Sequence, residues 1–218
     1  METLLKPQAE TYTTLYPISW DTFAQIAAEL GESPNRRLAY QGGYLQIMSP
    51  LMEHENNNWF IARLIFTMAE TWGLDIKSVG SLTLKRDDLQ KGVEPDACFY
   101  LQNEPAVRSR QQIDLNQGDP PPDLAIEIDI TSGSLDKFPI YAALGVPEIW
   151  RYDGKHLRIY GLSRPSEGYR EMQHSFALPL LDITLIPLWL KQRLNLGETA
   201  TLRQVKEWAR DQVTEKNT

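Results

Sequence analysis

A short apolar stretch that carries two carboxylates is the feature that most constrains the fold of this chain. Residues 124–130 read LAIEIDI, and five of the seven are apolar, which is typical of a central strand covered on both faces. Glu127 and Asp129 are the exceptions. Because residues two apart on a strand share a face and lie about 7 Å apart, both acids are predicted to line one wall of a cleft. Burying them calls for a metal, a cation or a reaction that uses them.

Further charged residues are predicted to meet this strand. Asp96 follows Pro95 at the start of an expected strand over residues 97–101, so it can face the two acids across the sheet, and Lys137 lies just beyond them in the chain. Mg²⁺ prefers oxygen ligands and keeps several waters, so Asp96, Glu127 and Asp129 are candidate metal ligands. Such an ion would activate a water against a phosphodiester, with Lys137 orienting the water or stabilising transition-state charge.

The 218 residues predict one α/β domain with its own core. Residues 1–13 lack periodicity and are expected to form a loose arm, residues 14–190 the main domain, and residues 191–218 a C-terminal helix with a polar tail. Helices are expected from Ser19 to Gly31, over a long stretch that ends at Gly73, from Asp136 to Gly145, and over residues 202–210. Strands are expected over residues 38–40, 44–48, 76–79, 82–84, 97–101, 148–152 and 157–160.

Composition excludes several classes of protein. Cys98 is the only cysteine, so the chain has no internal disulfide, and a reducing cytoplasm is the expected location. The apolar stretch 178–190 is broken by Asp182 and Pro187 and is too short to span a membrane, so it is expected to form core or an interface. The net charge of −7 argues against tight, extended binding of nucleic acid. The paired cations, such as Arg36 and Arg37, are accordingly expected to be solvated surface residues.

Several separate motifs together resemble one family. They are the sequences VEPD at residues 93–96, PDLAIE at 122–127 and GVPEIW at 145–150, with Lys137, Tyr141 and an upstream GYLQIMSP followed by His54. This pattern resembles the Uma2 family (DUF820), which is common in cyanobacteria and is similar to the PD-(D/E)XK restriction-type endonucleases. The resemblance covers residues 18–153. It implies a restriction-endonuclease-like core, a mixed central β-sheet flanked by helices, with Asp96 and Glu127 as metal ligands.

The resemblance also implies a function and partners. It predicts an endonuclease that uses Mg²⁺, or Mn²⁺ in its place, to hydrolyse DNA, acting as a homodimer because two strands call for two sites. Trp189, expected to be exposed, or the apolar stretch 178–190 is the expected dimer interface. The alternative is a catalytically degenerate member of the same fold that serves as a binding or assembly module.

Two departures from the family pattern leave questions open. The nuclease pattern places a lysine two residues after the glutamate, but this chain has Asp129 there, and Lys137 is taken as a migrated replacement. Many relatives carry an acid where this chain has Gln46. Asp129 is therefore either a metal ligand or the ion-pair partner of Lys137. His54 either orients a phosphate or water, or is structural, and an acid beside it is expected to cap the helix that follows.

Overall fold

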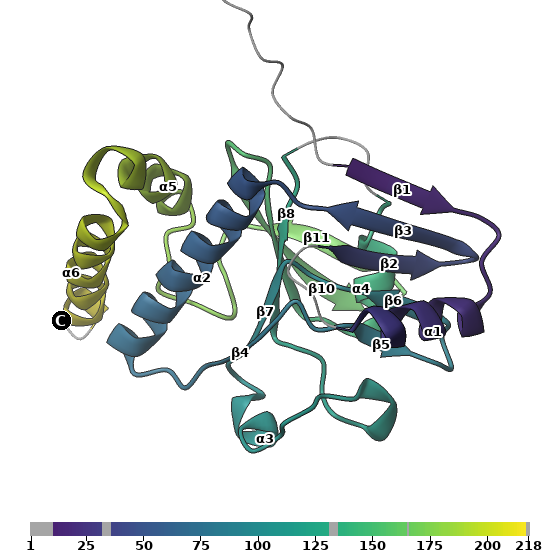
Figure 1. Ribbon diagram of the computed structural model, residues 1–218. Helices are drawn as coiled ribbons and strands as arrows, with labels where there is room; N and C mark the ends of the chain where they lie inside the picture. Colours follow the sequence, from purple (N-terminus) through teal and green to yellow (C-terminus); the bar gives the residue numbers. More distant parts are fainter. Residues whose placement is uncertain (1–10, 32–35, 131–134, 165, 217–218) are drawn as a thin grey trace, which may run out of the picture.

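The computed structural model describes residues 11–31, 36–130, 135–164 and 166–216. Within these ranges the chain forms two β-sheets and six α-helices (Figure 1). The fold class predicted above, a mixed central sheet flanked by helices, is confirmed. Among the described helices, none combines the length and the apolar character that crossing a membrane requires.

The larger sheet contains the predicted acidic strand at its centre. Its six strands run in the order β11–β10–β9–β8–β7–β4. They are β11 (Gly168–Met172), β10 (Leu157–Arg164), β9 (Glu148–Tyr152), β8 (Leu124–Ile128), β7 (Ala97–Tyr100) and β4 (Lys77–Gly80). Neighbouring strands are antiparallel except β8 and β9, which are parallel and are connected through helix α4 (Phe138–Leu144).

The smaller sheet is antiparallel and lies beside the larger one (Figure 1). Its strands, in spatial order, are β1 (Thr11–Leu15), β3 (Tyr44–Ser49), β2 (Arg37–Gln41), β6 (Lys91–Val93) and β5 (Leu84–Arg86). Helix α1 (Trp20–Leu30) packs on this sheet through Phe23 and Ala27. The predicted cap of α1 is confirmed, because the Ser19 hydroxyl accepts a hydrogen bond from the amide of Thr22 at 3.1 Å.

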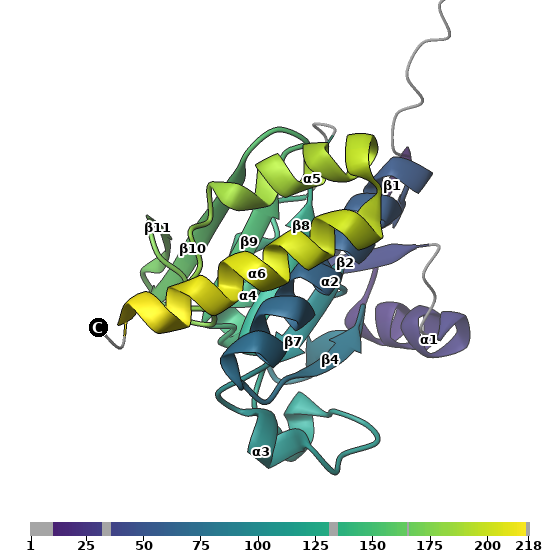
Figure 2. The ribbon, with the colours of Figure 1, turned by 90° about the vertical axis from the view of Figure 1, so that its left-hand side faces the viewer.

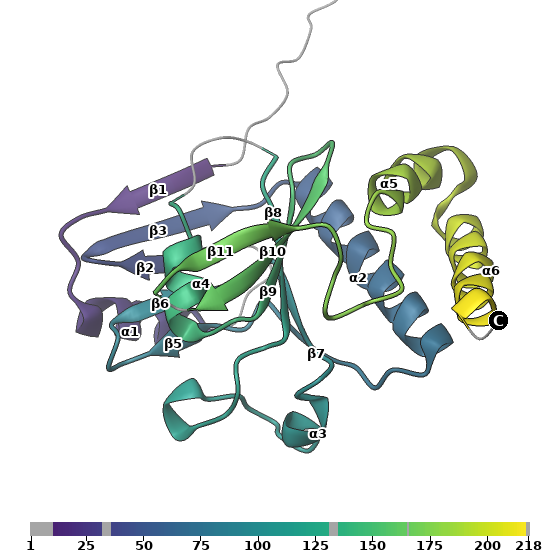
Figure 3. The same cartoon turned by 180° about the vertical axis from the view of Figure 1, so that it is seen from behind.

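The helices divide between the two faces of the larger sheet. On one face α2 (Met52–Trp72) packs on the strands, and α5 (Leu185–Leu196) and α6 (Glu198–Lys216) cover α2 from outside (Figure 2). On the other face α4 fills the space where the two sheets meet (Figure 3). Two short helical segments, α3 (Glu104–Val107) and the 3₁₀ turn η1 (Leu115–Gln117), lie in the connection between β7 and β8. The predicted cleft strand β8 is therefore covered on both faces.

Several boundaries differ from those predicted. Residues 11–13 of the expected loose arm belong to β1 and pair with β3, whereas residues 1–10 lie outside the described ranges. The boundary placed at residue 190 falls inside α5. Trp189, expected in an exposed interface, is only 7% exposed, because its ring packs against Trp208 of α6. That part of the interface prediction is wrong.

Candidate active site

Alternation along β8 separates its apolar side chains from its acid. Leu124, Ile126 and Ile128 face α2, whereas Ala125 belongs to the cluster around α4 on the opposite face. Glu127 points to that same opposite side, where it meets residues of α4. Glu127 and Asp129 both line a cavity of about 170 Å³.

Asp96 enters the site from the neighbouring strand. It precedes β7, and its amide donates to the carbonyl of Ile126 at 3.1 Å. Its side chain accepts the amide of Ile128 at Oδ2, at 2.8 Å, and is completely buried. Asp96 therefore forms two hydrogen bonds with the end of β8, and its carboxylate lies beside the strand that carries Glu127.

His54 supports Asp96 from helix α2. Its Nε2 atom lies 3.2 Å from Asp96 Oδ2 and 3.0 Å from the carbonyl oxygen of Ile128. Both neighbours are acceptors, so Nε2 carries the proton. The imidazole is fully buried, which places it behind Asp96 rather than against a substrate phosphate. Helix α2 begins after Leu51 without a side-chain cap hydrogen bond, and Glu55 pairs with Arg37, but Glu53 and Glu55 do lie in the first turn, where the helix dipole favours carboxylates.

Lys137 and Tyr141, both in the α4 segment, contact the carboxylate of Glu127. Lys137 immediately precedes α4 and Tyr141 lies one helical turn later, so their side chains lie on the same face. Lys137 Nζ lies 2.6 Å from Glu127 Oε2, and the Tyr141 hydroxyl donates a hydrogen bond to Glu127 Oε1. The lysine from the next helix therefore does reach the glutamate of β8.

Asp129 has a different partner from the one expected. Its carboxylate forms an ion pair with Arg151 of β9, the strand parallel to β8. The alternative in which Asp129 pairs with Lys137 is wrong, because Lys137 pairs with Glu127. Gln46, at the position of the missing family acid, is buried and accepts the amide of Leu135 at 2.8 Å, so it anchors the segment leading to Lys137.

Sequence reasoning did not identify Arg37 as part of this cluster. Its side chain is only 2% exposed, contrary to the solvated surface pair expected there, and its Nε lies 3.2 Å from Asp96 Oδ1. Its Nη2 lies 3.1 Å from Glu55 Oε1. The contacts join β2, α2 and the start of β7, and no local pattern predicts such a meeting. An arginine at the start of an otherwise apolar strand was the one available signal.

Burial and the neighbouring polar groups shift the pKa values of the two central carboxylates in opposite directions. Burial would raise the pKa of Asp96, but His54 outweighs that effect and holds the pKa below its ordinary value, and the charges of Lys137 and Arg37 act the same way. Burial raises the pKa of Glu127, opposed by Lys137 and reinforced by Asp96. For Lys137, burial would lower the pKa, but the two carboxylates raise it. Paired acids whose pKa values diverge are typical of catalytic sites.

The donor set fits a divalent cation at two of the three predicted ligands. Asp96 Oδ1 is a buried oxygen that accepts no hydrogen bond from the described residues, and Glu127 lies close enough for the two charges to interact. Two carboxylates with waters are enough for Mg²⁺. The third predicted ligand does not join them, because Asp129 is bound to Arg151. Across the described ranges, no three His, Cys, Asp or Glu side chains gather as a metal-binding group.

Comparisons with known proteins agree with this fold. The model of the Uma2 family, described as "Putative restriction endonuclease", matches residues 20–196. A crystal structure of "a putative nuclease belonging to DUF820" from Anabaena variabilis superposes with a TM-score of 0.54 at 19% sequence identity, covering 80% of this chain and 99% of that one. No curated protein matches this chain.

Proposed function

Since the chain belongs to the Uma2 family, we propose that it is a Mg²⁺-dependent endonuclease that hydrolyses phosphodiester bonds in DNA. The observation that carries the proposal is the meeting of Asp96, Glu127 and Lys137 in one polar cluster, although they come from three separate segments. A buried group of two carboxylates and one ammonium is costly to fold, and a reaction explains its presence.

Each residue has a distinct part in the proposed reaction. Asp96 and Glu127 would hold Mg²⁺, or Mn²⁺ in its place. When bound, the ion would polarise the scissile phosphate and lower the pKa of a water. Lys137, fixed by Glu127, would orient the attacking water or stabilise the developing negative charge. His54 is a positioning residue, since it touches Asp96 and is too buried to reach a phosphate.

Contact with DNA would be local. The net charge of −7 gives no broad attraction for a polyanion. Arg151 borders the cavity that contains Glu127, and its side chain is 44% exposed, so it can contact a backbone phosphate. Asp129, bound to Arg151, would orient that guanidinium rather than hold the metal. A transient complex in the cytoplasm is the expected mode of action.

Cleavage of supercoiled plasmid tests the proposal. With Mg²⁺ or Mn²⁺ the wild type is expected to nick and linearise the plasmid, and Asp96→Asn, Glu127→Gln and Lys137→Met are each expected to lose about 100-fold or more in rate. Glu70→Gln is the control, because Glu70 lies on α2, pairs with Lys206, and its side chain is 74% exposed. Equal cleavage by wild type and the three site variants would sink the proposal.

A binding or assembly module is the second candidate. It is favoured by the fact that each predicted ligand already has a protein cation beside it: Arg37 at Asp96, Lys137 at Glu127 and Arg151 at Asp129. The same assay separates the two, because a module of this kind would cut no plasmid with either metal, however pure and well folded the protein.

We further propose that the protein is a homodimer, so that each protomer cuts one strand of a duplex. Light scattering on the purified protein is expected to give twice the 25.0 kDa mass of one chain. A monomer mass at the concentrations used for cleavage would contradict this. With Trp189 buried under α6, the interface is expected on another surface.

A further inference from the structure

The charges of the candidate metal site are already balanced without a metal. Arg37 and Lys137 offset Asp96 and Glu127, so these four buried side chains carry two positive and two negative charges, and the partly exposed Glu55 adds a third acid on the far side of Arg37. The side chains of Arg37 and Asp96 are 2% and 0% exposed, so solvent screens this group weakly. A divalent cation added to it would leave two excess positive charges, which is unfavourable in a buried site. This charge balance in the buried group favours the displacement of one resident cation when the ion enters.

Arg37 is the cation whose contact is easiest to exchange. Lys137 is tied to Glu127 at 2.6 Å in a charge-assisted hydrogen bond. The contact of Arg37 Nε with Asp96 Oδ1 is longer, at 3.2 Å, and is not a hydrogen bond by its geometry. Asp96 Oδ1 thus has its charge compensated by Arg37 while its lone pairs stay available to a metal. Arg37 therefore lies beside the Asp96 oxygen that an entering metal cation would approach.

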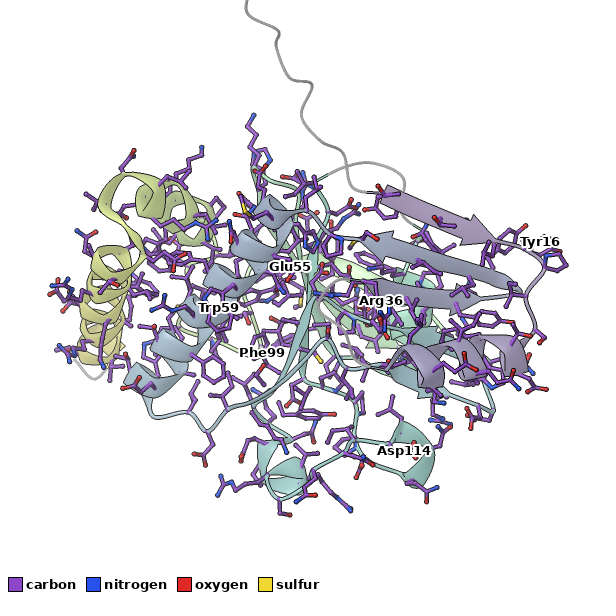
Figure 4. All side chains as sticks on the ribbon, in the orientation of Figure 1. Tyr16, Arg36, Glu55, Trp59, Phe99 and Asp114 are labelled. Carbon is purple, nitrogen blue, oxygen red and sulfur yellow. The ribbon has the colours of Figure 1, made fainter. Side chains whose placement is uncertain are left out.

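Glu55 provides a partner that can keep Arg37 after it leaves Asp96. Arg37 Nη2 already lies 3.1 Å from Glu55 Oε1, on a side chain that is 35% exposed. Glu55 and Asp96 both border a cavity of about 200 Å³, which Asn58 and Trp59 also line. Glu55 and Trp59 both project from α2, about one helical turn apart (Figure 4). Trp59 is 64% exposed, and its ring offers a face on which a guanidinium can stack.

We propose that Arg37 is a resident counter-ion of the metal site, which leaves Asp96 for Glu55 when a divalent cation binds. The inference rests on the proposed function, since it assumes the same metal site. Arg37 acts through Asp96 and touches neither metal nor substrate, so it is a positioning residue. Its role is to balance the charge of Asp96 and to hold that carboxylate in place while the site holds no metal.

Titration calorimetry with MgCl₂ and MnCl₂ tests the exchange without measuring cleavage. Arg37→Gln is expected to bind the cation about tenfold more tightly than wild type, the scale of a typical coupling between two sites. Arg37→Lys keeps the positive charge but has one ammonium where the guanidinium contacts both acids, so its affinity is expected to lie between those of wild type and Arg37→Gln. Glu55→Gln is expected to weaken binding, because Arg37 loses its receiving partner. In the Arg37→Gln background, Glu55→Gln is expected to change nothing.

The outcomes separate this inference from the proposed function. If wild type binds the metal and Arg37→Gln binds equally or more weakly, the counter-ion role is overturned while the metal site stands. If no variant binds either metal, both fail. A Glu55→Gln effect of the same size in both backgrounds would overturn the exchange between the two acids. Circular dichroism shows whether Arg37→Gln folds. If it does not, Glu55→Gln alone tests the exchange, because Glu55 is partly exposed and its replacement is expected to weaken metal binding. An unchanged affinity of Glu55→Gln would then overturn the exchange.

Discussion

At the scale of single residues, the charged side chains of the site hold one another through partners from different elements. Asp96 of the β7 segment is set by His54 of α2, and Glu127 of β8 is set by Lys137 and Tyr141 of the α4 segment. Each carboxylate therefore depends on a neighbour that is placed behind it, His54 for Asp96 and Tyr141 for Glu127, while Lys137 both holds Glu127 and would act on the water or the phosphate. The contribution of His54 and Tyr141 is to fix the geometry and the pKa of the two carboxylates.

Tyr141 gives a specific test of this positioning. Its hydroxyl lowers the pKa of Glu127, so Tyr141→Phe is expected to raise that pKa further. Because Glu127 must be ionised to hold the metal, the acidic limb of the cleavage rate is expected to move to higher pH. The free energy of unfolding is expected to fall by about 1–3 kcal/mol, because a buried carboxylate oxygen loses its donor.

A matched control exists for Tyr141. Tyr169 also donates its hydroxyl to a nearby acceptor, the carbonyl of Val146, and packs near α4, but it has no contact with Glu127. Tyr169→Phe is expected to lower stability without moving the pH profile of cleavage. A profile for Tyr141→Phe that coincides with wild type would show that the hydroxyl only stabilises the fold.

The same residues show how much of the candidate site could be predicted from the sequence. The sequence could predict that Asp96, Glu127 and Lys137 lie together. Burying an acid in an apolar strand costs free energy unless it has partners, and the family pattern indicates which residues these partners are. The sequence could not predict that Asp129 pairs with Arg151 and not with Lys137, because that ion pair depends on the parallel register of β8 and β9. Arg37 lies 59 positions before Asp96, and only the packing of the two sheets brings them together.

At the scale of elements, local signals identified those that have clear ends. Ser19 and Gly31 bound α1, and Gly145 ends α4, whose Pro139 falls in the first turn. Helix α5 was not predicted as a helix because Pro187 interrupts its apolar run. Pro187 is the third residue of α5, where its missing amide would have had no partner in the helix.

Other elements lacked any local signal. Strand β11 reads GYREM and mixes polar and apolar residues on both faces, so its pairing with β10 determines its conformation. Strand β6 has only three residues and includes Gly92, whose missing side chain leaves room for the ring of Phe23. Both strands form because longer neighbours offer them a hydrogen-bonding edge, which is a tertiary effect on β-structure.

At the scale of the whole molecule, the C-terminal helices belong to the same core as the candidate site. Thr201, Val205 and Ala209, four residues apart along α6, are completely buried, and Trp72 of α2 donates its indole N–H to the carbonyl of Ala209 at 2.9 Å. Helix α2 in turn supplies His54 to the site. A division of the chain near residue 190 would cut through this shared core.

This shared core predicts that the whole chain unfolds as one unit. Denaturation followed by circular dichroism and by tryptophan fluorescence is expected to give coincident single transitions. Val205→Asp buries an unpaired carboxylate between α6 and α2, so the complete transition is expected to move to lower denaturant, with a loss of about 3 kcal/mol or more. Lys206→Gln is the control: it removes only the exposed pair with Glu70, and its effect is expected to stay within about 0.5 kcal/mol. If Val205→Asp instead produced a separate early transition and left the main one in place, α6 would be an appendage that unfolds independently of the sheet and of the site that the sheet supports.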